Sequence, residues 1–471
     1  MPKRLFDLSD EILLHVAHFA NRDHAIPLPS FGPHWENYKS EIDRSVAKDY
    51  LALRATCRKL SRLLVPKNLH LKLKSWIELE DWLMRVPTSV LEGIKRLELN
   101  IPWDRSDETL IFGKWIALTT FLNTLCSLEE LIIRDLPMCR HFFGDDRDTI
   151  DLKRPLAQFL PNLTALSIEV QCGNCAAAFP RLLVPAAPKL RHLKMCTNQS
   201  ITEGEDDEDD GSDDDDQDQG HIIKSGHVIT SIYDGWKERY PLDTPAIETL
   251  FIRLANGEES CASIIEAVSD FPYLQTLHMS SFKYSLSSVG NIQKINTIGA
   301  IIATPSTSGW DLKFSNSDIK DCYPFELFPV ILQSLPNLKS FDPMFVVEID
   351  QPRPSPSYAT RQITRSAAPS ACIPSINAIV VYEERLREAM SVIAETMIQV
   401  VPSLTNGAFW ESAWTNQTGQ LWHRWTWTTK QVNGVRKVVV AEVPQALTKD
   451  FASNLDGAMN RSGGQFVVTS Q

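Results

Sequence analysis

The chain has 471 residues, 43 % of them apolar, and a formal net charge of −12. That length allows more than one domain and a substantial core, but no run of about 18 apolar residues offers a membrane-spanning helix. Met1–Asp7 lacks the apolar core of a signal peptide, and the nine cysteines are scattered, so we expect a protein of the cytoplasm and/or nucleus.

The N-terminal region predicts two short amphipathic helices. Asp7 or Ser9 can cap the first helix. The apolar positions recur at helical spacing, and Asn21–Arg44, which contains three prolines, is expected to form an exposed loop between the two halves. Two such helices cannot bury both faces alone, so either the rest of the chain or a partner must cover them. The apolar positions are Ile12, Leu13, Val16, Phe19 and Ala20 in the first helix, and Leu53, Cys57, Leu60 and Leu64 in the second.

The order of these elements resembles the F-box, the segment that joins a substrate receptor to a cullin-based ubiquitin ligase. The match runs through Leu8–Val16, Tyr50–Leu60 and Pro66–Leu69, with Ser9 where the family usually has proline. The resemblance implies that a Skp-family adaptor binds the residues at the family's apolar positions, which are Leu8, Ile12, Leu13, Val16, Leu53, Cys57 and Leu60. We assign residues 1–74 to this domain, with a loop insertion at 21–44. The alternative is an N-terminal cap on a larger domain.

Six later segments share the pattern L-x-x-L-x-L, with conservative apolar replacements. Their starts are 34, 35, 27, 57 and 27 residues apart, and a Pro-x-Leu or Pro-x-Ile sequence opens most of them. Proline ends the preceding helix, and alternating apolar residues then predict a short strand. Pro336-Asn337-Leu338 and Pro402-Ser403-Leu404 continue the series with weaker strands. The six segments are Ile94–Leu99, Leu128–Ile133, Leu163–Ile168, Leu190–Met195, Ile247–Ile252 and Leu274–Met279.

Helical patterns fill several of the gaps, at Phe112–Leu125, Ser260–Phe271 and Glu383–Val401. Strand, turn and helix at a period near 30 resemble the leucine-rich repeat. The expected fold class is therefore α/β: a helical F-box, then an irregular leucine-rich-repeat solenoid over residues 75–349, then a C-terminal β-hairpin cap. An ordinary α/β domain with parallel strands is the alternative. The layout of this chain, an F-box followed by irregular repeats and a tryptophan-rich end, is similar to that of many fungal F-box proteins.

Glu203–Asp218 contains twelve acidic residues and no basic ones. Without it the chain has 47 basic and 47 acidic side chains, so the rest is neutral and has no basic stripe typical of nucleic-acid binding. The tract predicts a disordered insertion, residues 203–220, between two repeats. It could also attract basic partners, and Ser212 suits an acid-directed kinase.

The sequence contains no established enzyme signature. Cys172-Gly-Asn-Cys175 lacks a second pair for a zinc site, and a turn between strand and helix explains it better than a redox site does. No phosphate-binding loop or nucleophile elbow occurs. We therefore expect no catalytic residue, cofactor or metal, although a thiol enzyme using Cys172 and Cys175 stays as a weaker alternative.

The last part of the chain predicts a loop and a hairpin. Residues 350–375 are rich in Pro and Ser, carry Arg353, Arg361 and Arg365, and are expected to be a flexible loop. Residues 376–471 are assigned to the last repeat and a tryptophan-rich hairpin cap that turns at Asn433-Gly434.

In the repeat strands the leucines should face the core and the intervening residues should form the opposite face, because strand side chains alternate. The middle positions of that face form a row, which we call the column: Glu98, Ile132, Ser167, Lys194, Phe251 and His278. We expect Ile132 and Phe251 to be exposed anchors for a protein target centred near Phe251 and Arg253. The candidate target-binding residues are Ile132, Lys194, Phe251, Arg253 and His278.

Together these features predict a non-enzymatic substrate receptor of an SCF-type ubiquitin ligase. It would bind a Skp-family adaptor, and through it a cullin, as well as a protein target, with no nucleic-acid or membrane partner. The alternative is a leucine-rich scaffold that never meets the ligase.

Overall fold

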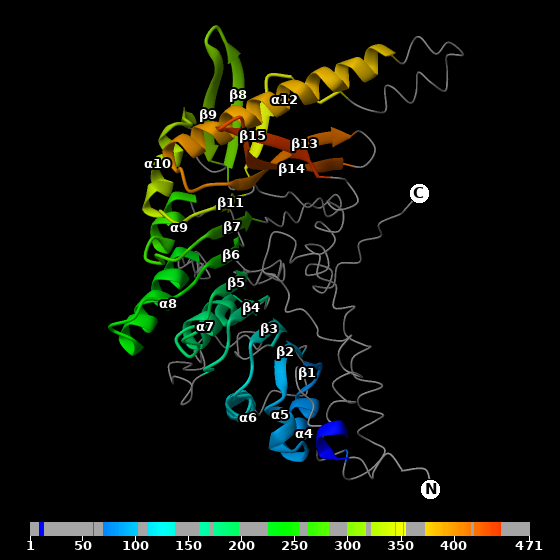
Figure 1. The fold of residues 1–471 in the computed structure, drawn as a ribbon, viewed down its shortest axis with the longest axis vertical. Helices are drawn as coiled ribbons and strands as arrows, with labels where there is room; N and C mark the ends of the chain where they lie inside the picture. Colours follow the sequence, from blue (N-terminus) through cyan, green and yellow to red (C-terminus); the bar gives the residue numbers. More distant parts are fainter. Residues whose placement is uncertain are drawn as a thin grey trace, which may run out of the picture. The chain divides into compact units, whose positions relative to one another are not determined.

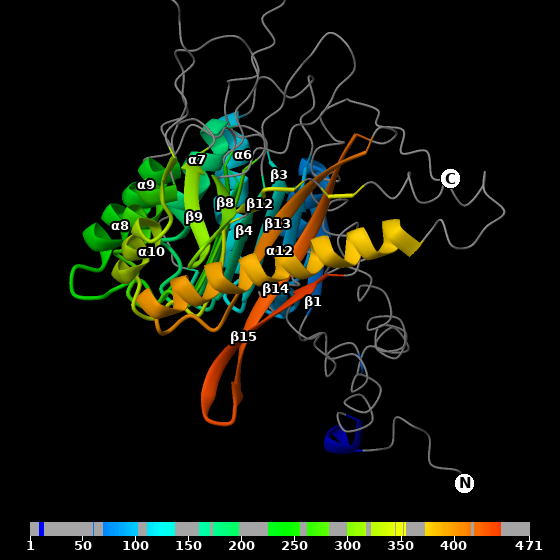
Figure 2. The same cartoon turned by 90° about the horizontal axis from the view of Figure 1, so that it is seen from above.

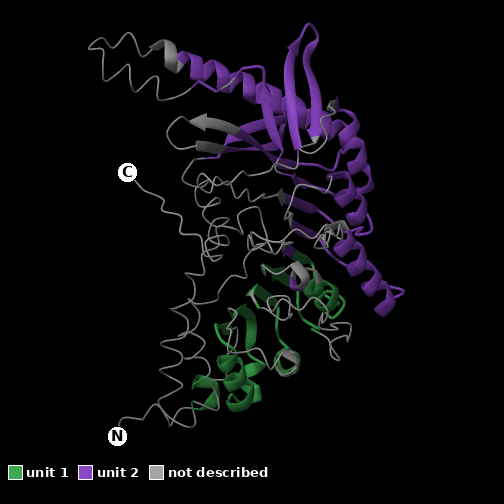
Figure 3. Ribbon diagram, turned by 180° about the vertical axis from the view of Figure 1, so that it is seen from behind, with its two compact units in different colours: residues 1–170, 178–193, 454–471 green, residues 171–177, 194–453 purple. Residues whose placement is uncertain are grey.

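A computed structural model places the strands and helices. It describes residues 9–13, 60, 69–101, 111–136, 160–169, 173–196, 225–254, 261–281, 299–316, 322–343, 345–351, 353–354, 373–415 and 419–443. The predicted loop 21–44, the acidic tract, and Cys172, Arg361 and Arg365 lie outside these residues. The chain forms two compact units, whose division falls within α7 (Gly173–Leu183) and β5 (His192–Cys196) (Figure 3).

The first unit contains a parallel sheet in which each strand pairs with the next one along the chain. The order is β1 (Leu69–Leu73), β2 (Ile94–Asn100), β3 (Glu130–Asp135) and β4 (Ala165–Ile168). Between strands lie α4 (Trp76–Arg85), α5 (Thr88–Leu91) and α6 (Ile111–Thr124) (Figure 1). Ser75 caps α4, because its hydroxyl accepts from the Glu78 N–H at 3.2 Å.

The second unit begins with the same alternation. Helix α8 (Ser225–Arg239) precedes β6 (Thr249–Leu254), and α9 (Cys261–Val268) joins β6 to β7 (Thr276–Ser281). Strand β7 pairs in parallel with β11 (Ser340–Asp342), and β11 pairs in parallel with β13 (Asn406–Thr415). The strands expected after Pro336 and Pro402 are therefore confirmed.

An antiparallel insertion adds strands that the repeat pattern did not predict. It comprises β8 (Gly299–Ser306), β9 (Gly309–Asn316) and β10 (Cys322–Pro324), and β8 pairs in parallel with β12 (Val346–Ile349). The short helix α10 (Leu327–Ile331) and the 3-10 turn η7 (Leu332–Ser334) follow it. Strands β8, β9, β10 and β12 lack the L-x-x-L spacing that predicted the strands of the six segments.

The C-terminal part of the second unit is a helix and a hairpin. Helix α12 (Ile373–Val400) packs against β12 and β15 (Figure 2). Its predicted apolar residues Leu386, Met390, Ile393 and Met397 are buried. Strand β14 (Gly419–Val432) pairs antiparallel with both β13 and β15 (Val435–Glu442).

The predicted Asn-Gly turn is confirmed. Asn433 and Gly434 both have positive φ, 53° and 77°, as a two-residue turn of type I′ requires, and Val432 faces Val435 across it. The mixed α/β class with a mostly parallel sheet is likewise confirmed. No helix among the described residues is long and apolar enough to cross a membrane.

Candidate functional site

The strand leucines face the core, as predicted. Leu97, Leu131, Leu166, Leu250 and Leu277 are fully buried. The column positions stand in register on the other face of the strands. In the first unit Glu98 faces Ile132, which faces Ser167; in the second Phe251 faces His278, which faces Asp342.

The expected exposure of Ile132 and Phe251 is wrong. Only 6 % of Ile132 and 4 % of Phe251 are exposed. Strand alternation decides which face a side chain occupies, but it does not decide whether neighbouring side chains cover it. Lys194 lies over the Phe251 ring, and the register places Glu98 and Ser167 on either side of Ile132.

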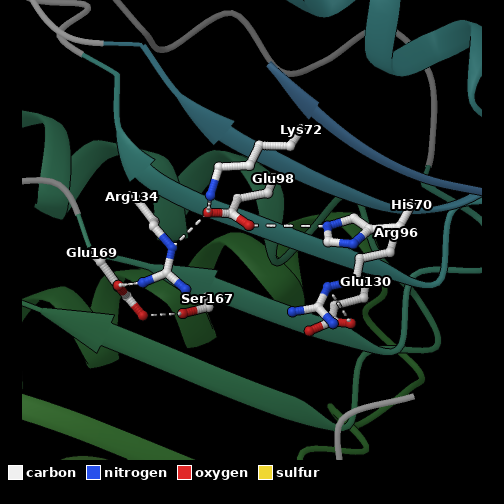
Figure 4. A network of polar contacts seen from close by, with 8 residues as sticks. All are labelled: His70, Lys72, Arg96, Glu98, Glu130, Arg134, Ser167 and Glu169. Carbon is white, nitrogen blue, oxygen red and sulfur yellow. Dashed lines mark hydrogen bonds and ion pairs between the residues drawn. The ribbon is translucent and has the colours of Figure 1, made fainter. Parts of the chain in front are cut away.

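A buried carboxylate organises the column face of the first unit (Figure 4). Glu98 is fully buried, and its Oε1 accepts from Lys72 Nζ at 2.7 Å and from Arg134 Nε at 2.8 Å. His70 Nε2 lies 3.9 Å from the other oxygen. Burial favours the neutral acid, but Arg134 and Lys72 outweigh it, so the pKa of Glu98 is lowered. Glu98 is therefore an ionised link between three strands.

Arg134 extends this network to a fourth strand. Its Nη1 donates to Glu169 Oε2 at 3.0 Å, and Ser167 Oγ donates to the other Glu169 oxygen at 3.2 Å. Attraction to Glu169 and Glu98 raises the pKa of Arg134 despite its burial. The fork of a guanidinium suits this bridge because it presents several donors in one plane.

The neighbouring pair, Arg96 and Glu130, is also buried. Arg96 Nε lies 3.2 Å from Glu130 Oε2. Burial raises the pKa of Glu130 to about 7, with Arg96 opposing and Glu98 reinforcing the shift. The column face of this unit thus holds two buried carboxylates, of which one is held ionised and the other is drawn toward protonation.

Asp342 is the corresponding buried carboxylate of the second unit. Its Oδ2 accepts from Arg424 Nη2 at 2.7 Å and lies 3.1 Å from His278 Nδ1. Burial opposes ionisation, but His278 and Arg424 outweigh it, so the pKa of Asp342 lies well below its usual range. Arg424 also lies over the Trp410 ring, 6.0 Å from its centroid.

Three candidate target-binding residues come together beside Asp342. The rings of Phe251 and His278 are stacked, with centroids 4.2 Å apart and planes at 10°, and Lys194 Nζ lies 5.2 Å from the Phe251 centroid. The side chain of Arg253 lies outside the described part of the structure. Lys194, Phe251 and His278 therefore form one cluster, but its aromatic members pack together instead of standing free.

A third polar cluster lies beside α12 and was not predicted. Arg353 donates to Glu411 at 2.6 Å and to Glu383 at 2.8 Å, while the Tyr382 hydroxyl and Trp425 Nε1 also donate to Glu411, at 3.0 and 3.2 Å. Burial, followed by the charge of Glu411, raises the pKa of Tyr382. Arg353 belongs to the segment assigned to a flexible loop, so the start of that segment is anchored.

Few of the predicted adaptor-binding residues are described. Leu13 and Leu60 are buried, whereas Ile12 is 48 % exposed, and residues 10–13 are helical. Leu8, Val16, Leu53 and Cys57 lie outside the described residues. Among the three that are described, Ile12 is the side chain that a partner can reach.

Because these clusters are buried and join neighbouring strands, they are suited to holding the strands in register. In the described part of the chain, no group of three or more His, Cys, Asp or Glu residues is placed to hold a metal ion. No model of a known protein family matches the sequence, and no curated protein matches it.

Proposed function

We propose that this protein is a non-enzymatic receptor built on leucine-rich repeats, which captures a protein target and delivers it to a ubiquitin ligase through an N-terminal F-box. The observation that carries the proposal is a turn that recurs at four of the six segments and at the Pro336 and Pro402 continuations, together with a hydrogen-bonded step between consecutive segments within each unit. Recurrence of one geometry along a chain is typical of repeat proteins.

The recurring turn immediately precedes strands β3, β4, β5, β7, β11 and β13. In it, the N–H of the first leucine of the segment donates to the carbonyl three residues earlier, at 3.0 to 3.3 Å. Both ends of the turn are buried, so each turn fixes where the next strand begins. The six donors are Leu128, Leu163, Leu190, Leu274, Leu338 and Leu404.

The recurring step links consecutive segments within each unit. The residue after the first leucine donates its N–H to the carbonyl of the equivalent residue in the preceding segment, as from Glu129 to Lys95 at 2.8 Å and from Lys339 to Gln275 at 2.8 Å. Asparagine of the Pro-Asn-Leu sequence adds a second link: Asn162 donates to the Cys126 carbonyl, and Asn337 to the Pro272 carbonyl. The Pro-Asn-Leu motif thus has a physical role in stacking segments.

A stack of this kind presents a broad face of adjacent strands, and repeat proteins commonly bind other proteins on such a face. The F-box resemblance supplies the second half of the proposal. Its adaptor would bind the apolar residues of the N-terminal F-box match, of which Ile12 is exposed.

Capture of a Skp-family adaptor by the full-length protein tests the proposal. We expect the wild type to bind and Ile12→Asp to lose binding, because a charge would enter an apolar contact. Ile77→Asp is the matched control, since Ile77 is a 72 % exposed isoleucine on α4 outside the F-box match. Melting temperatures of the variants distinguish lost contact from lost folding.

A wild-type protein that does not bind the adaptor would refute the ligase function and leave the scaffold alternative. Equal binding by Ile12→Asp and wild type would refute the assigned surface. Loss of binding by Ile77→Asp would mean that the contact does not depend on the F-box match.

A further inference from the structure

The column face continues onto the β14–β15 hairpin. Paired residues of an antiparallel ladder share a face. Arg424, which binds Asp342, pairs with Trp410, so the even-numbered residues of β14 and their β15 partners lie on the column face. There Val432 faces Val435, Lys430 faces Lys437 and Thr428 faces Val439.

On the hairpin this face is open. Val432, Val435 and Val439 are 40, 60 and 39 % exposed, and Lys430 and Lys437 are exposed as well. The turn between the two strands projects past α12 (Figure 2). The hairpin therefore provides the solvent-exposed apolar side chains that were expected at Ile132 and Phe251.

The two lysines have no structural partner that explains them. Like charges directly opposite each other destabilise a sheet. Neither lysine forms an ion pair with another described residue, and the carboxylates of Glu411 and Glu442, which contact the odd-numbered residues Trp425 and His423, belong to the opposite face of the hairpin. A cross-strand lysine pair flanked by Val432, Val435 and Val439 fits a negatively charged partner with apolar residues.

The outer edge of β15 has unpaired backbone groups. A two-residue turn makes Val432 and Val435 a hydrogen-bonded pair, so β15 residues 435, 437, 439 and 441 bond to β14 and Arg436, Val438 and Val440 direct their N–H and C=O groups outward. In the described part of the chain no other strand pairs with this edge. An added strand there would place its side chains beside Lys437 and Val439.

We propose that the hairpin binds an extended acidic segment of the target protein, which adds to the edge of β15 and sets carboxylates against Lys430 and Lys437 and apolar side chains against the valines. This inference rests on the proposed receptor function for the identity of the partner. Charge complementarity selects an acidic segment, and the free edge selects an extended one.

Fluorescence anisotropy with the full-length protein tests this directly. The probe is a labelled peptide of alternating Glu and Val, compared with one of alternating Lys and Val. We expect the wild type to bind only the acidic peptide. The double variant Lys430→Glu, Lys437→Glu should bind that peptide with an affinity lower by about tenfold or more. Lys313→Glu is the matched control, because Lys313 is an exposed lysine on the β9 strand of another hairpin.

Stability and adaptor capture keep the test interpretable. Lys430→Glu alone should raise the melting temperature, since it places opposite charges across the ladder. It should still lower the affinity for the acidic peptide. Lost peptide binding with unchanged adaptor capture supports the inference. Peptide binding by a wild type that does not capture the adaptor would refute the ligase function and leave the hairpin site standing.

Several outcomes would overturn the inference. They are no binding of the acidic peptide by wild type, equal binding by the double charge reversal, and equal binding of the Lys/Val peptide. Displacement of the peptide by polyuridylate would indicate a general polyanion site. A wild-type dimer that the double variant abolishes would indicate that the edge pairs with a second copy.

Discussion

Glu130 shows how one buried carboxyl makes stability depend on pH. Its folded pKa of about 7 lies above the ordinary value of 4.5. Between these values the folded state holds a proton that the unfolded state has lost, so stability is fullest below the lower value and falls as pH rises through the upper one.

Glu130→Gln should remove this decline. We expect the wild type to lose stability between about pH 5 and about pH 8, by at most roughly 3 kcal/mol, and the variant to show a flatter profile. Urea unfolding across that range measures both. Glu129→Gln is the control, because Glu129 is only partly buried and pairs with Lys95. A variant with the wild-type slope would show that the Arg96 pair keeps Glu130 ionised.

Asp342, in contrast to Glu130, has a lowered pKa and is held ionised in the folded state. Removing its charge leaves Arg424 and His278 around a neutral amide in a buried site, so Asp342→Asn should cost about 3 to 5 kcal/mol. Asp350→Asn should cost less than about 1 kcal/mol, because its ion pair with Arg385 is exposed. Chemical denaturation of the two variants makes the comparison. Similar small losses would mean that solvent reaches the Asp342 cluster.

Gly407 sets the spacing of three strands at the element scale. It lies opposite Phe341 of β11 and Trp427 of β14, and a Cβ atom there would be 2.7 Å from the Trp427 ring and closer still to the Phe341 carbonyl. Gly407→Ala should therefore cost about 3 kcal/mol, since neither neighbour can move without breaking the ladder.

Gly434→Ala supplies the comparison. Its added methyl would meet no atom within 4 Å, so the penalty comes only from the positive φ, about 1 kcal/mol. Thermal unfolding measures both variants. Equal effects of the two substitutions would mean that the β11–β13–β14 junction is loosely packed.

The sequence predicts elements well where one spacing repeats. Leu97, Leu131 and Leu166 mark strands because each begins a Leu-x-Leu alternation, and Asn433-Gly434 marks its own turn. Strand β1 has the same alternation at Leu69, Leu71 and Leu73 but lies outside the six segments, and β8, β9 and β12 lack the Leu-x-Leu spacing. Their pairing depends on residues distant in the chain, which no local pattern contains.

The candidate site was predicted less completely, for a related reason. Alternation placed Glu98, Phe251 and His278 on one face, but their partners Lys72 and Asp342 come from strands outside the six segments. The exposed part of the face was missed because Lys430 and Val435 were assigned to a cap. The sequence does contain the necessary information, because the Asn433-Gly434 turn places Lys430 opposite Lys437 and Val432 opposite Val435 on one face.

At the scale of the whole molecule, charge is unevenly divided along the chain. Glu203–Asp218 accounts for the entire net charge of −12, since the remaining side chains balance at 47 basic and 47 acidic. A net negative protein repels an acidic partner over roughly 10 Å at about 0.1 M salt and over longer distances at lower salt. An acidic partner that approaches the proposed hairpin site is therefore repelled by the net negative charge of this chain.

Deleting Glu203–Asp218 should therefore accelerate association of the Glu/Val peptide at low salt, because the deletion leaves the chain neutral and keeps Lys430 and Lys437. The acceleration should vanish at high salt, where screening already hides the tract. Stopped-flow fluorescence measures the rates, and an unchanged melting temperature shows that both units still fold. A deletion that leaves the low-salt rate unaltered would mean that only local charges govern binding at the hairpin. A slower rate would mean that the tract assists the encounter, which an acidic partner does not allow.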